Sequence, residues 1–521
     1  MVEIKIMNKQ AKLLMIQGTG SNVGKSVLVA GLCRYFVQQG LKVAPFKAQN
    51  MALNSFITPE GHEMGRAQAV QAEACKITPH VDMNPVLIKP NTDVGAQVII
   101  HGVPVGNMSA MDYHQYKEKA WPAVLTSFKR LAATYDLIVI EGAGSPAEVN
   151  LREHDIVNMG LALAVQAPVL LVGDIDKGGV FAAFVGTIAL LAPEERQLVK
   201  GLIINKFRGD IGLLEPGLAP IAARCKVPFV GVVPYFRGFY VPEEDGVAVE
   251  NYGRGKIVRE EADHVLAIAV IKLPHIANFT DFDPLLHEMD VRLDYLLPED
   301  ELVGYDLVIL PGSKNTIDDL RTLCRVGFPQ RLHDFVKAGG AVVGICGGYQ
   351  MLGQKISDPH QVETTSGSVS GFGLLPVITE LAREKITVQS QGRLLFPFGA
   401  GEANLQVAGY EIHMGRTSLL SGAKPLLQLA PVADSDHDAG HPDGAVNAEG
   451  LCWGTYLHGI FDQDIFRRAW LDFLKKRRYG FVEQTGSRTS FAKLKEQGLN
   501  QLAALLSANL KMSDITKIIG L

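Results

Sequence analysis

The chain has 521 residues, enough for about three average domains or two large ones with cores of their own. Its 50 basic and 55 acidic side chains give a formal net charge of −5, so nucleic acid is not an expected partner. The six cysteines form no Cys-x-x-Cys pair, which excludes a disulfide scaffold and a zinc ribbon and predicts a reducing cytoplasm. We expect no secretory signal, because residues 1–12 alternate charged and apolar residues without an apolar h-region and cleavage signal, and no membrane span, because no stretch reaches ~20 apolar residues.

Short apolar runs alternate with helical patterns in the first half of the chain, which is typical of βαβ units around a parallel sheet. Two of these runs, 13–17 and 42–45, flank a helix predicted over 25–39. Four further strands are predicted at 136–140, 169–173, 201–205 and 229–233. Together these segments predict one doubly wound α/β domain.

A polar stretch at 247–262 predicts a linker, after which a second series of apolar runs begins. These runs predict strands at 264–272, 307–311, 341–345, 405–410 and 451–456. Segment 490–510 carries leucines at helical spacing, which predicts a packed terminal helix. The predicted organisation is therefore a first α/β domain at 1–250, a second at 262–480, and a C-terminal helical tail at 481–521.

A glycine-rich loop follows the first predicted strand and reads Gly18-Thr-Gly-Ser-Asn-Val-Gly-Lys-Ser26. It is one residue longer than the common G-x-x-x-x-G-K-[ST] pattern. Backbone N–H groups at a helix N-terminus can cradle phosphate oxygens, Lys25 can reach the terminal phosphates, and Ser26 can hold Mg²⁺. The strand and helix on either side disfavour the alternative of an ordinary glycine turn. The candidate nucleotide contacts here are Gly18, Thr19, Gly24, Lys25 and Ser26.

Charged residues at other strand ends are further candidates in this domain. Glu141 ends a buried strand and suits an Mg²⁺ ligand, although a strand-end surface residue is the alternative. Lys47 follows the second strand and could contact phosphate or solvent. Asp174 and Asp176 end another strand and could bind metal or substrate, or lie at the surface.

The sequence Gly344-Ile-Cys346-Gly-Gly348 has the form of a nucleophile elbow between a strand and a helix. The glycine turn exposes the sulfur and the helix N-terminus favours the thiolate, whereas a buried structural cysteine is disfavoured because the glycines serve no core packing. His458, after the strand at 451–456, is the candidate base. The N–H groups of Ser313 and Gly347 could form an oxyanion hole, unless the first lies in an ordinary turn.

The two halves together resemble a glutamine-dependent amidoligase. The second half resembles the class I glutamine amidotransferases, which implies a flavodoxin-like α/β fold, and the first resembles P-loop ATPases of the dethiobiotin synthetase type. More specific strings resemble the cobyric acid synthase family over about residues 13 to 475. These strings lie at 45–55, 141–148, 154–159, 174–181, 277–284 and 409–413.

The resemblance implies ATP- and glutamine-dependent amidation of the b, d, e and g carboxylates of a corrinoid, adenosylcobyrinic acid a,c-diamide, in cobalamin biosynthesis. It implies L-glutamine as the ammonia donor and ATP with Mg²⁺ as the activating group. Lys47 would then contact the phosphates or the carboxylate, and Asn205 would lie beside the adenine. Gly312 and Gln350 would contact the glutamine.

Two positions depart from the family patterns. Class I amidotransferases carry glutamate two residues after the catalytic histidine, whereas this chain has Ile460. A Cys346–His458 dyad is therefore expected, with a backbone carbonyl or a distant acid orienting the imidazole. Lys177 stands where the resemblance leads us to expect arginine, and it could grip substrate carboxylates, beside Asp174 and Asp176 as the other candidate substrate contacts.

Two alternative functions remain open from the sequence. The first is a cobyrinic acid a,c-diamide synthase, which the string at 49–55 disfavours. The second is a P-loop ATPase joined to a glutamine-sensing domain without catalysis, which the presence of Cys346 and His458 disfavours. Cys346-dependent release of glutamate would separate either synthase from the sensor.

Overall fold

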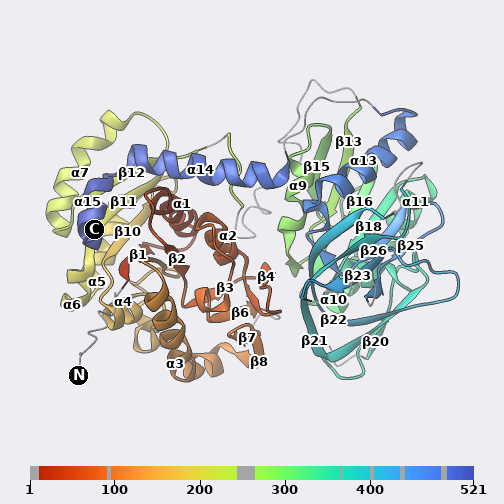
Figure 1. Ribbon diagram of the computed structural model, residues 1–521, viewed down its shortest axis with the longest axis horizontal. Helices are drawn as coiled ribbons and strands as arrows, with labels where there is room; N and C mark the ends of the chain where they lie inside the picture. The colour runs from red at the N-terminus through yellow and green to blue at the C-terminus, as the bar shows by residue number, and fades with distance from the viewer. Residues whose placement is uncertain are drawn as a thin grey trace, which may run out of the picture. The chain divides into compact units, whose positions relative to one another are not determined.

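The computed structural model describes residues 11–90, 95–236, 238–242, 264–363, 367–398, 404–433, 440–482 and 490–521. Its contacts divide the chain into two compact units, whose elements are drawn in Figure 1. Unit 1 comprises Met1–Ala52, Glu63–Glu244 and Lys493–Leu521, and unit 2 comprises Leu53–His62 and Asp245–Ala492. The linker predicted at 247–262 lies outside the described residues, and the predicted domain limits stay a prediction.

Unit 1 is built on a parallel sheet of six strands in the order β12-β11-β10-β1-β9-β2. Its strands are β1 (Lys12–Gly18), β2 (Val43–Phe46), β9 (Leu137–Glu141), β10 (Val169–Asp174), β11 (Val199–Phe207) and β12 (Phe229–Pro234). All six predicted strands form, because each is an apolar run buried on both faces of the sheet. From β1 the chain first adds strands on one side of the sheet, β9 and β2, and later on the other side, β10 to β12. β1 therefore lies beside the point where the strand order reverses, which is where ligands bind in open α/β sheets.

The helices of unit 1 surround these strands (Figure 1). They are α1 (Lys25–Gln38), α2 (Arg66–Ala74), α3 (Ala110–Thr134), α4 (Met159–Val165), α5 (Val180–Leu190), α6 (Pro193–Leu198), α7 (Ile211–Cys225), α14 (Phe491–Asn509) and α15 (Met512–Ile519), with short 3₁₀ turns η1 (Val81–Met83) and η2 (Val149–His154). The predicted terminal helix is α14, and its Leu502 and Leu506 pack in the same core as α1. Gly31 of α1 permits this contact, because a Cβ there would lie 2.5 Å from Leu506 Cδ1.

Unit 1 also contains a small sheet that was not predicted. Its strands are β3 (Gln49–Met51), β6 (Val86–Pro90), β7 (Gly95–Ile100) and β8 (Val103–Ser109), in the order β3-β6-β7-β8. Two further short strands flank residues 58–62: β4 (Ser55–Ile57), which belongs to unit 2, and β5 (Glu63–Gly65), which belongs to unit 1. These strands lack the long apolar runs of the main sheet, and β8 is almost wholly exposed, so periodicity alone did not indicate them.

Unit 2 has a six-stranded sheet in the order β15-β13-β16-β18-β26-β25, parallel except at β25. Its strands are β13 (Leu266–Ile271), β15 (Val291–Leu296), β16 (Leu307–Leu310), β18 (Ala341–Ile345), β25 (Ala445–Val446) and β26 (Cys452–Thr455). Numbered along the chain, the five parallel strands follow the order 2-1-3-4-5 of flavodoxin-like folds. The structure thus confirms the predicted class of two doubly wound α/β domains.

A second, largely antiparallel sheet in unit 2 carries residues of the site described below. It contains β19 (Lys355–Ser357), β20 (Ser368–Ser370), β21 (Val377–Leu394), β22 (Gln406–Leu419), β23 (Leu427–Pro431), β24 (His441–Asp443) and β27 (Leu457–His458). The strand predicted at 405–410 is only the beginning of β22, because pairing with β21 extends it to Leu419. On the other edge of β22, β27 pairs His458 with Tyr410.

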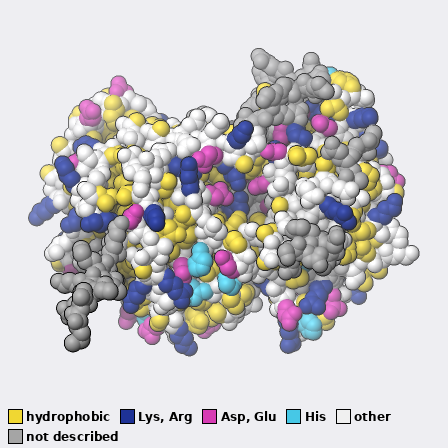
Figure 2. All heavy atoms as spheres, in the orientation of Figure 1, with side chains coloured by type: hydrophobic (Ala, Val, Ile, Leu, Met, Phe, Trp, Pro, Cys, Tyr) yellow, Lys and Arg dark blue, Asp and Glu magenta, His cyan; other side chains and the backbone are white. Residues whose placement is uncertain are grey.

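The remaining elements of unit 2 connect these sheets. They are β14 (Ile276–Ala277), β17 (Gly312–Ser313), η3 (Phe279–Phe282), α9 (Asp283–Leu286), α10 (Thr316–Arg325), α11 (Phe328–Lys337), α12 (Gly347–Leu352), η5 (Ile460–Asp462) and α13 (Asp464–Tyr479). Among the described helices, none is both long and apolar enough to cross a membrane. Figure 2 shows acidic and basic side chains interspersed on the visible face, as the nearly balanced charge predicts.

Candidate active sites

The glycine-rich loop of unit 1 connects β1 to α1, as predicted, and its tight path requires glycine at two positions. A Cβ on Gly18 would lie 2.6 Å from Val23 Cγ2. Gly24 has φ 94°, and a Cβ there would lie 2.2 Å from Asn205 Nδ2. Thr19 is fixed by donation of its N–H to Val172 O at 2.8 Å. These close approaches, the positive φ of Gly24 and the bond from Thr19 define the path of the loop.

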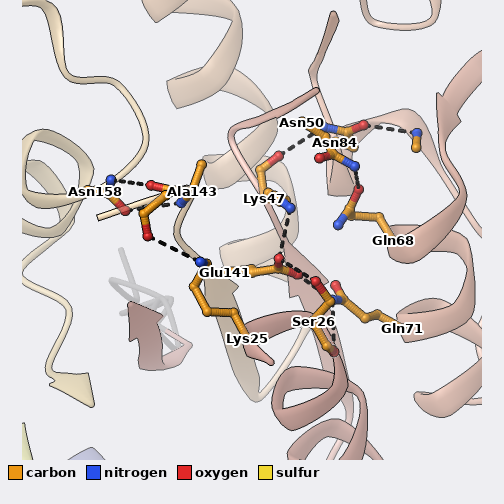
Figure 3. A network of polar contacts seen from close by, with 12 residues as sticks. Lys25, Ser26, Lys47, Asn50, Gln68, Gln71, Asn84, Glu141, Ala143 and Asn158 are labelled. Atoms are coloured by element: carbon orange, nitrogen blue, oxygen red, sulfur yellow. Dashed lines mark hydrogen bonds and ion pairs between the residues drawn. The ribbon is translucent and has the colours of Figure 1, made fainter. Parts of the chain in front are cut away.

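Lys25 folds back over this loop. Its Nζ donates to Gly20 O at 2.9 Å and to Gly144 O at 3.1 Å. Figure 3 shows the side chain directed toward the turn that contains Ala143. The turn that contains Gly144 is itself clamped, because Asn158 Nδ2 donates to Ala143 O at 2.6 Å and Ala143 N donates to Asn158 Oδ1 at 3.1 Å. The loop at 18–26 and the turn at 141–144 thus form one connected polar site.

Glu141, only 1% exposed, is the centre of that site. Its Oε1 accepts hydrogen bonds from Ser26 Oγ and Lys47 Nζ, both at 2.8 Å, and its Oε2 accepts one from Gln71 Nε2 at 2.5 Å. Figure 3 shows the three donors converging on the carboxylate from α1, from the segment after β2 and from α2. The structure therefore brings the predicted Ser26, Lys47 and Glu141 together.

The donor set around Ser26 and Glu141 fits a magnesium ion that is completed by other ligands. A hydroxyl and a carboxylate oxygen are the hard oxygen donors that Mg²⁺ prefers, and Mg²⁺ is often held by one or two protein oxygens with phosphates and water. The described residues contain no group of three or more His, Cys, Asp or Glu side chains that could hold a metal by itself. The residues present therefore suit a metal that arrives with nucleotide phosphates.

The other predicted residues of unit 1 divide into two groups. Asn205 and Asp174 lie at the loop. Asn205 Nδ2 donates to Val23 O at 2.8 Å. Lys206 Nζ donates both to Asn22 O, at 2.6 Å, and to Asp174 Oδ2, at 3.0 Å, and so connects Asp174 to the loop. Asp176 instead pairs with Arg208, with 3.1 Å between Oδ1 and Nε, and Lys177 is exposed. Adenine contact for Asn205, and substrate contact for the two aspartates and Lys177, stay predictions.

In unit 2, Cys346 lies at the junction of β18 and α12 with φ 52° and ψ −106°, a conformation that costs energy for any residue except glycine. A Cβ on Gly348 would lie 2.0 Å from Leu310 O, and one on Gly344 would lie 2.6 Å from Gly348 C. The expectation that the flanking glycines serve no packing was therefore wrong. They let the elbow pack closely against β16 while its strained turn presents the sulfur.

His458 is 1% exposed and is oriented by an acid far from it in the sequence. Its Nδ1 lies 2.6 Å from Oδ2 of Asp281, in η3, and Asp281 Oδ1 accepts the Gly459 N–H at 3.2 Å. Its Nε2 has no hydrogen-bond partner among the described residues. Cys346, 8% exposed, directs its Sγ to Ile412 O at 3.5 Å.

The electrostatics of this site favour a protonated imidazole. Burial alone lowers the pKa of His458, but the charge and hydrogen bond of Asp281, together with the nearby Cys346, outweigh burial and raise this pKa to about 10. At neutral pH the ring therefore carries a proton that it can donate. Of the two orienting groups considered for a chain with Ile460, the distant acid is the one the structure shows.

The predicted oxyanion and glutamine residues lie around the same centre. A Cβ on Gly347 would be 3.0 Å from Ser313 N, so the two backbones are in contact, and one on Gly312 would be 3.3 Å from His458 Cε1. Gln350 Nε2 donates to Tyr456 OH at 3.1 Å, whereas its buried Oε1 has no partner among the described residues. The structure thus brings all the predicted residues of unit 2 together.

Comparison with known proteins gives both halves a family. A model described as "CobQ/CobB/MinD/ParA nucleotide binding domain" matches residues 14–247, and one described as "CobB/CobQ-like glutamine amidotransferase domain" matches residues 267–466. A cobyric acid synthase from Syntrophobacter fumaroxidans is 46% identical over 98% of this chain and 99% of its own length. The chain belongs to the cobyric acid synthase family.

Other relatives agree with this assignment. A cobyric acid synthase from Desulfitobacterium hafniense is 48% identical over 98% of this chain and 99% of its own, and one from Klebsiella pneumoniae is 49% identical over 97% of each. The solved structure of PurLQS from Thermotoga maritima covers 40% of this chain and 99% of that one, with 19% identity and a TM-score of 0.32, too weak a likeness to carry an argument. The predicted family and the predicted glutamine-dependent amidating enzyme are confirmed.

Three residues of this cobyric acid synthase family member were not identified from the sequence as parts of a site. Asp281 and Asn158 lie in the strings 277–284 and 154–159, which carried only the resemblance. Gln71 lies on α2 without any motif. Two observations could have identified Asp281 as the group that orients His458. Ile460 replaces the glutamate that usually follows the histidine, and Asp281 is an acid in a string shortly after the strand predicted at 264–272.

Proposed function

We propose that this protein converts adenosylcobyrinic acid a,c-diamide to adenosylcobyric acid by amidating the b, d, e and g carboxylates, with glutamine as ammonia donor and ATP as activating group. The observation that carries the proposal is the buried Cys346–His458–Asp281 arrangement in a chain that also holds the phosphate-loop site around Glu141. Family membership supports the corrinoid substrate.

The glutaminase reaction uses groups already in place in unit 2. The Cys346 thiolate attacks the side-chain amide carbon of glutamine, and the carbonyl electron pair moves to oxygen, where the Ser313 and Gly347 N–H groups stabilise it. As the tetrahedral species collapses, the C–N bond breaks and His458 donates its proton to the departing ammonia. Water, deprotonated by His458, then hydrolyses the thioester to glutamate and restores the thiol.

The synthetase reaction belongs to unit 1. A carboxylate of the corrinoid attacks the γ-phosphorus of ATP, ADP leaves, and the resulting acyl phosphate has the leaving group that a free carboxylate lacks. Ammonia attacks the acyl carbon and phosphate departs. Lys25 and Lys47 stabilise the phosphate charge, and Mg²⁺ held by Ser26 and Glu141 supplies further neutralisation when bound.

The cysteine inventory supports a reducing compartment, and we assign the protein to the cytoplasm. All six cysteines are free and five of them are buried. Cys346 is among the buried ones, and its proposed chemistry requires a thiol that has not been oxidised.

Mass spectrometry of the corrinoid tests the proposed function. Adenosylcobyrinic acid a,c-diamide is incubated with enzyme, ATP, Mg²⁺ and glutamine, beside a Cys346→Ala variant given glutamine or ammonia. We expect stepwise conversion to adenosylcobyric acid, and a variant that works only with ammonia. Amidation of cobyrinic acid itself with an unchanged diamide would identify the alternative synthase, and a wild type without glutamate release would identify a sensor.

A further inference from the structure

Residues 53–62 come from the N-terminal half of the sequence but belong by their contacts to unit 2. Their first members bind residues of the glutaminase site. Asn54 Oδ1 accepts the Phe279 N–H at 3.2 Å, Ser55 N donates to Asn278 Oδ1 at 2.8 Å, and Tyr410 OH donates to Ser55 O at 3.1 Å. The proposed reaction gives these contacts no role, although they include the end of the string at 45–55.

Asn278 connects this segment to one edge of the imidazole. It has left-handed backbone angles, φ 55° and ψ 41°, directly before η3, and its carbonyl accepts the N–H of Asp281 at 3.0 Å. Its Nδ2 lies 3.5 Å from His458 Nδ1, the nitrogen that Asp281 binds. The loop that carries the orienting acid is therefore held at its start by Asn54 and Ser55.

Tyr410 connects the same segment to the face of the imidazole. Its ring stacks on that of His458, with the centroids 5.2 Å apart and the planes inclined by 13°. Ser55 thus binds both flanking residues, Asn278 through its N–H and Tyr410 through its carbonyl. Asn54 and Ser55 are almost fully buried, so water cannot replace these bonds and their loss would leave buried polar groups unpaired.

We propose that Asn54 and Ser55 are positioning residues of the glutaminase: they bind Phe279, Asn278 and Tyr410, and through these fix the ring of His458 against Asp281 and Cys346. The inference rests on the proposed function and deepens it. The reacting groups of the glutaminase site come from the C-terminal half, and the site is completed by residues more than 220 positions earlier, as the separation between Asn54 and Phe279 shows.

The far end of the segment offers a matched control. Thr387 Oγ1 donates to Gly61 O at 2.7 Å and so binds the segment at a residue other than Asn54 and Ser55. A Thr387→Val substitution removes this one bond and preserves side-chain shape. If the segment acts only as a general tether, Thr387→Val should lower the glutaminase kcat as much as Asn54→Ala or Tyr410→Phe.

The experiment measures glutamate release by the full chain as a function of glutamine concentration and pH. The variants are Asn54→Ala, Asn54→Asp, Tyr410→Phe and the control Thr387→Val. Asn54→Asp keeps the oxygen that accepts from Phe279, and Tyr410→Phe keeps the ring on His458 but loses the bond to Ser55. The groups whose charge or dipole faces the imidazole are Asp281 on η3, Asn278 directly before η3, Cys346 before α12 and Tyr410 on β22.

We expect kcat to fall about 10- to 100-fold in Asn54→Ala and about 10-fold in Tyr410→Phe, with KM for glutamine changed less than about 2-fold, because a displaced base affects the chemical steps. The alkaline limb of the pH profile should move to lower pH, since a displaced ring loses part of the stabilisation that Asp281 gives its proton. Asn54→Asp should recover most of the loss, and Thr387→Val should behave as wild type.

Several results would overturn the inference. The first is a kcat and pH profile unchanged in both Asn54→Ala and Tyr410→Phe, and another is an equal loss in Thr387→Val. If Asn54→Ala fails to fold, Tyr410→Phe decides, because it removes one oxygen and leaves the ring. A wild type without Cys346-dependent glutamate release overturns the proposed function as well, whereas an active wild type with unaffected variants overturns the inference alone.

Discussion

The two sites of this molecule satisfy their buried charges in opposite ways. At the phosphate loop the cations already have protein partners: Lys25 donates to two carbonyls, and Lys47 pairs with Glu141 at 2.8 Å. At the glutaminase centre, His458 has one nitrogen bound to Asp281, and its other nitrogen has no partner in the described part of the chain. The first site must exchange bonds to accept a ligand, whereas the second is arranged in advance.

The difference follows from the charge of what each site receives. A nucleotide brings several negative charges, so Lys25, which is kept in place by two neutral carbonyls, gains stronger bonds when anionic phosphate oxygens replace those carbonyls. Glutamine brings a neutral amide, and the charge on its oxygen appears only during the reaction. A site for that reaction gains most from fixed donors and a fixed proton, which the strained elbow at Cys346 and the Asp281–His458 pair supply.

The largest test of this comparison removes the charge that arranges the glutaminase centre. In Asp281→Asn, burial of His458 is no longer opposed, so its pKa falls from about 10 and the ring is neutral when ammonia must leave. We expect glutaminase kcat to fall on the order of 10³- to 10⁴-fold, with the alkaline limb of its pH profile moved to lower pH. Corrinoid amidation with added ammonia serves as the control and should be retained; its equal loss would contradict the assignment of Asp281 to the glutaminase.

The second test acts on the exchangeable site. Lys25→Ala removes the charge that would replace two carbonyl contacts with phosphate contacts. Amidation should fall on the order of 10³-fold with glutamine and with ammonia alike, since one preorganised donor is worth roughly 10²- to 10³-fold and Lys25 carries a full charge. Both rates are followed by mass spectrometry of the corrinoid. A variant rescued by ammonia would contradict this assignment, because it would show that Lys25 serves the glutaminase reaction.

A third change tests the contribution of the metal apart from that of the nucleotide. Glu141→Gln keeps an oxygen that can accept from Ser26 and Lys47 but removes the negative charge between them. We expect amidation to fall about 10²-fold and the Mg²⁺ concentration for half-maximal activity to rise, because a neutral amide is a poorer ligand for a hard cation. Titration of activity with Mg²⁺ at saturating ATP measures this. An unchanged titration curve would assign Glu141 to holding Lys47 alone.

The same contrast explains what the sequence could predict. All six strands of the main sheet in unit 1 were predicted because they are buried on both faces and read as continuous apolar runs. The loop at 18–26 and the elbow at Cys346 were found because sharp turns require glycines at fixed positions. By contrast, the strands β7 and β8 form a hairpin sheet without such runs, and no local pattern indicated them.

The partners of catalytic groups were the harder part to predict. Asp281 is 177 positions from His458, and only the fold of β14 and η3 beside β27 brings the two together. Gln71 and Asn158 are neutral amides, whose importance lies in the buried groups they bind and not in any reactivity of their own. Such partners depend on tertiary contacts, so a motif identifies the nucleophile more readily than the groups that orient it.

The smallest test concerns a charged cluster in unit 2, formed by Glu411, His413 and His441, and asks whether it serves stability alone. His441 Nε2 lies 3.1 Å from Glu411 Oε2. Burial alone raises the pKa of Glu411, but the His413 ring, whose Nε2 lies 3.7 Å from Oε2, and hydrogen bonds from His441 and Ser390 outweigh it and hold the pKa at about 2. The hydrogen bond with Glu411 outweighs burial and raises the pKa of His441. Glu411 is therefore ionised at every pH of interest, and the protonation of His441 decides whether the two side chains form an ion pair.

The sign of the pH dependence follows from that raised pKa. His441 is protonated both folded and unfolded below about pH 6.5, so its stabilisation is fully present there and is lost as pH rises through the folded pKa. Because the side chain is 51% exposed, we expect at most about 1 kcal/mol, or roughly 2–4 °C in Tm. His441→Gln should lower Tm by that amount at pH 6 and by progressively less as the pH rises, with His360→Gln, an exposed histidine of the same unit, as control. A loss of glutaminase kcat in His441→Gln at unchanged Tm would instead extend the preorganised centre as far as β24.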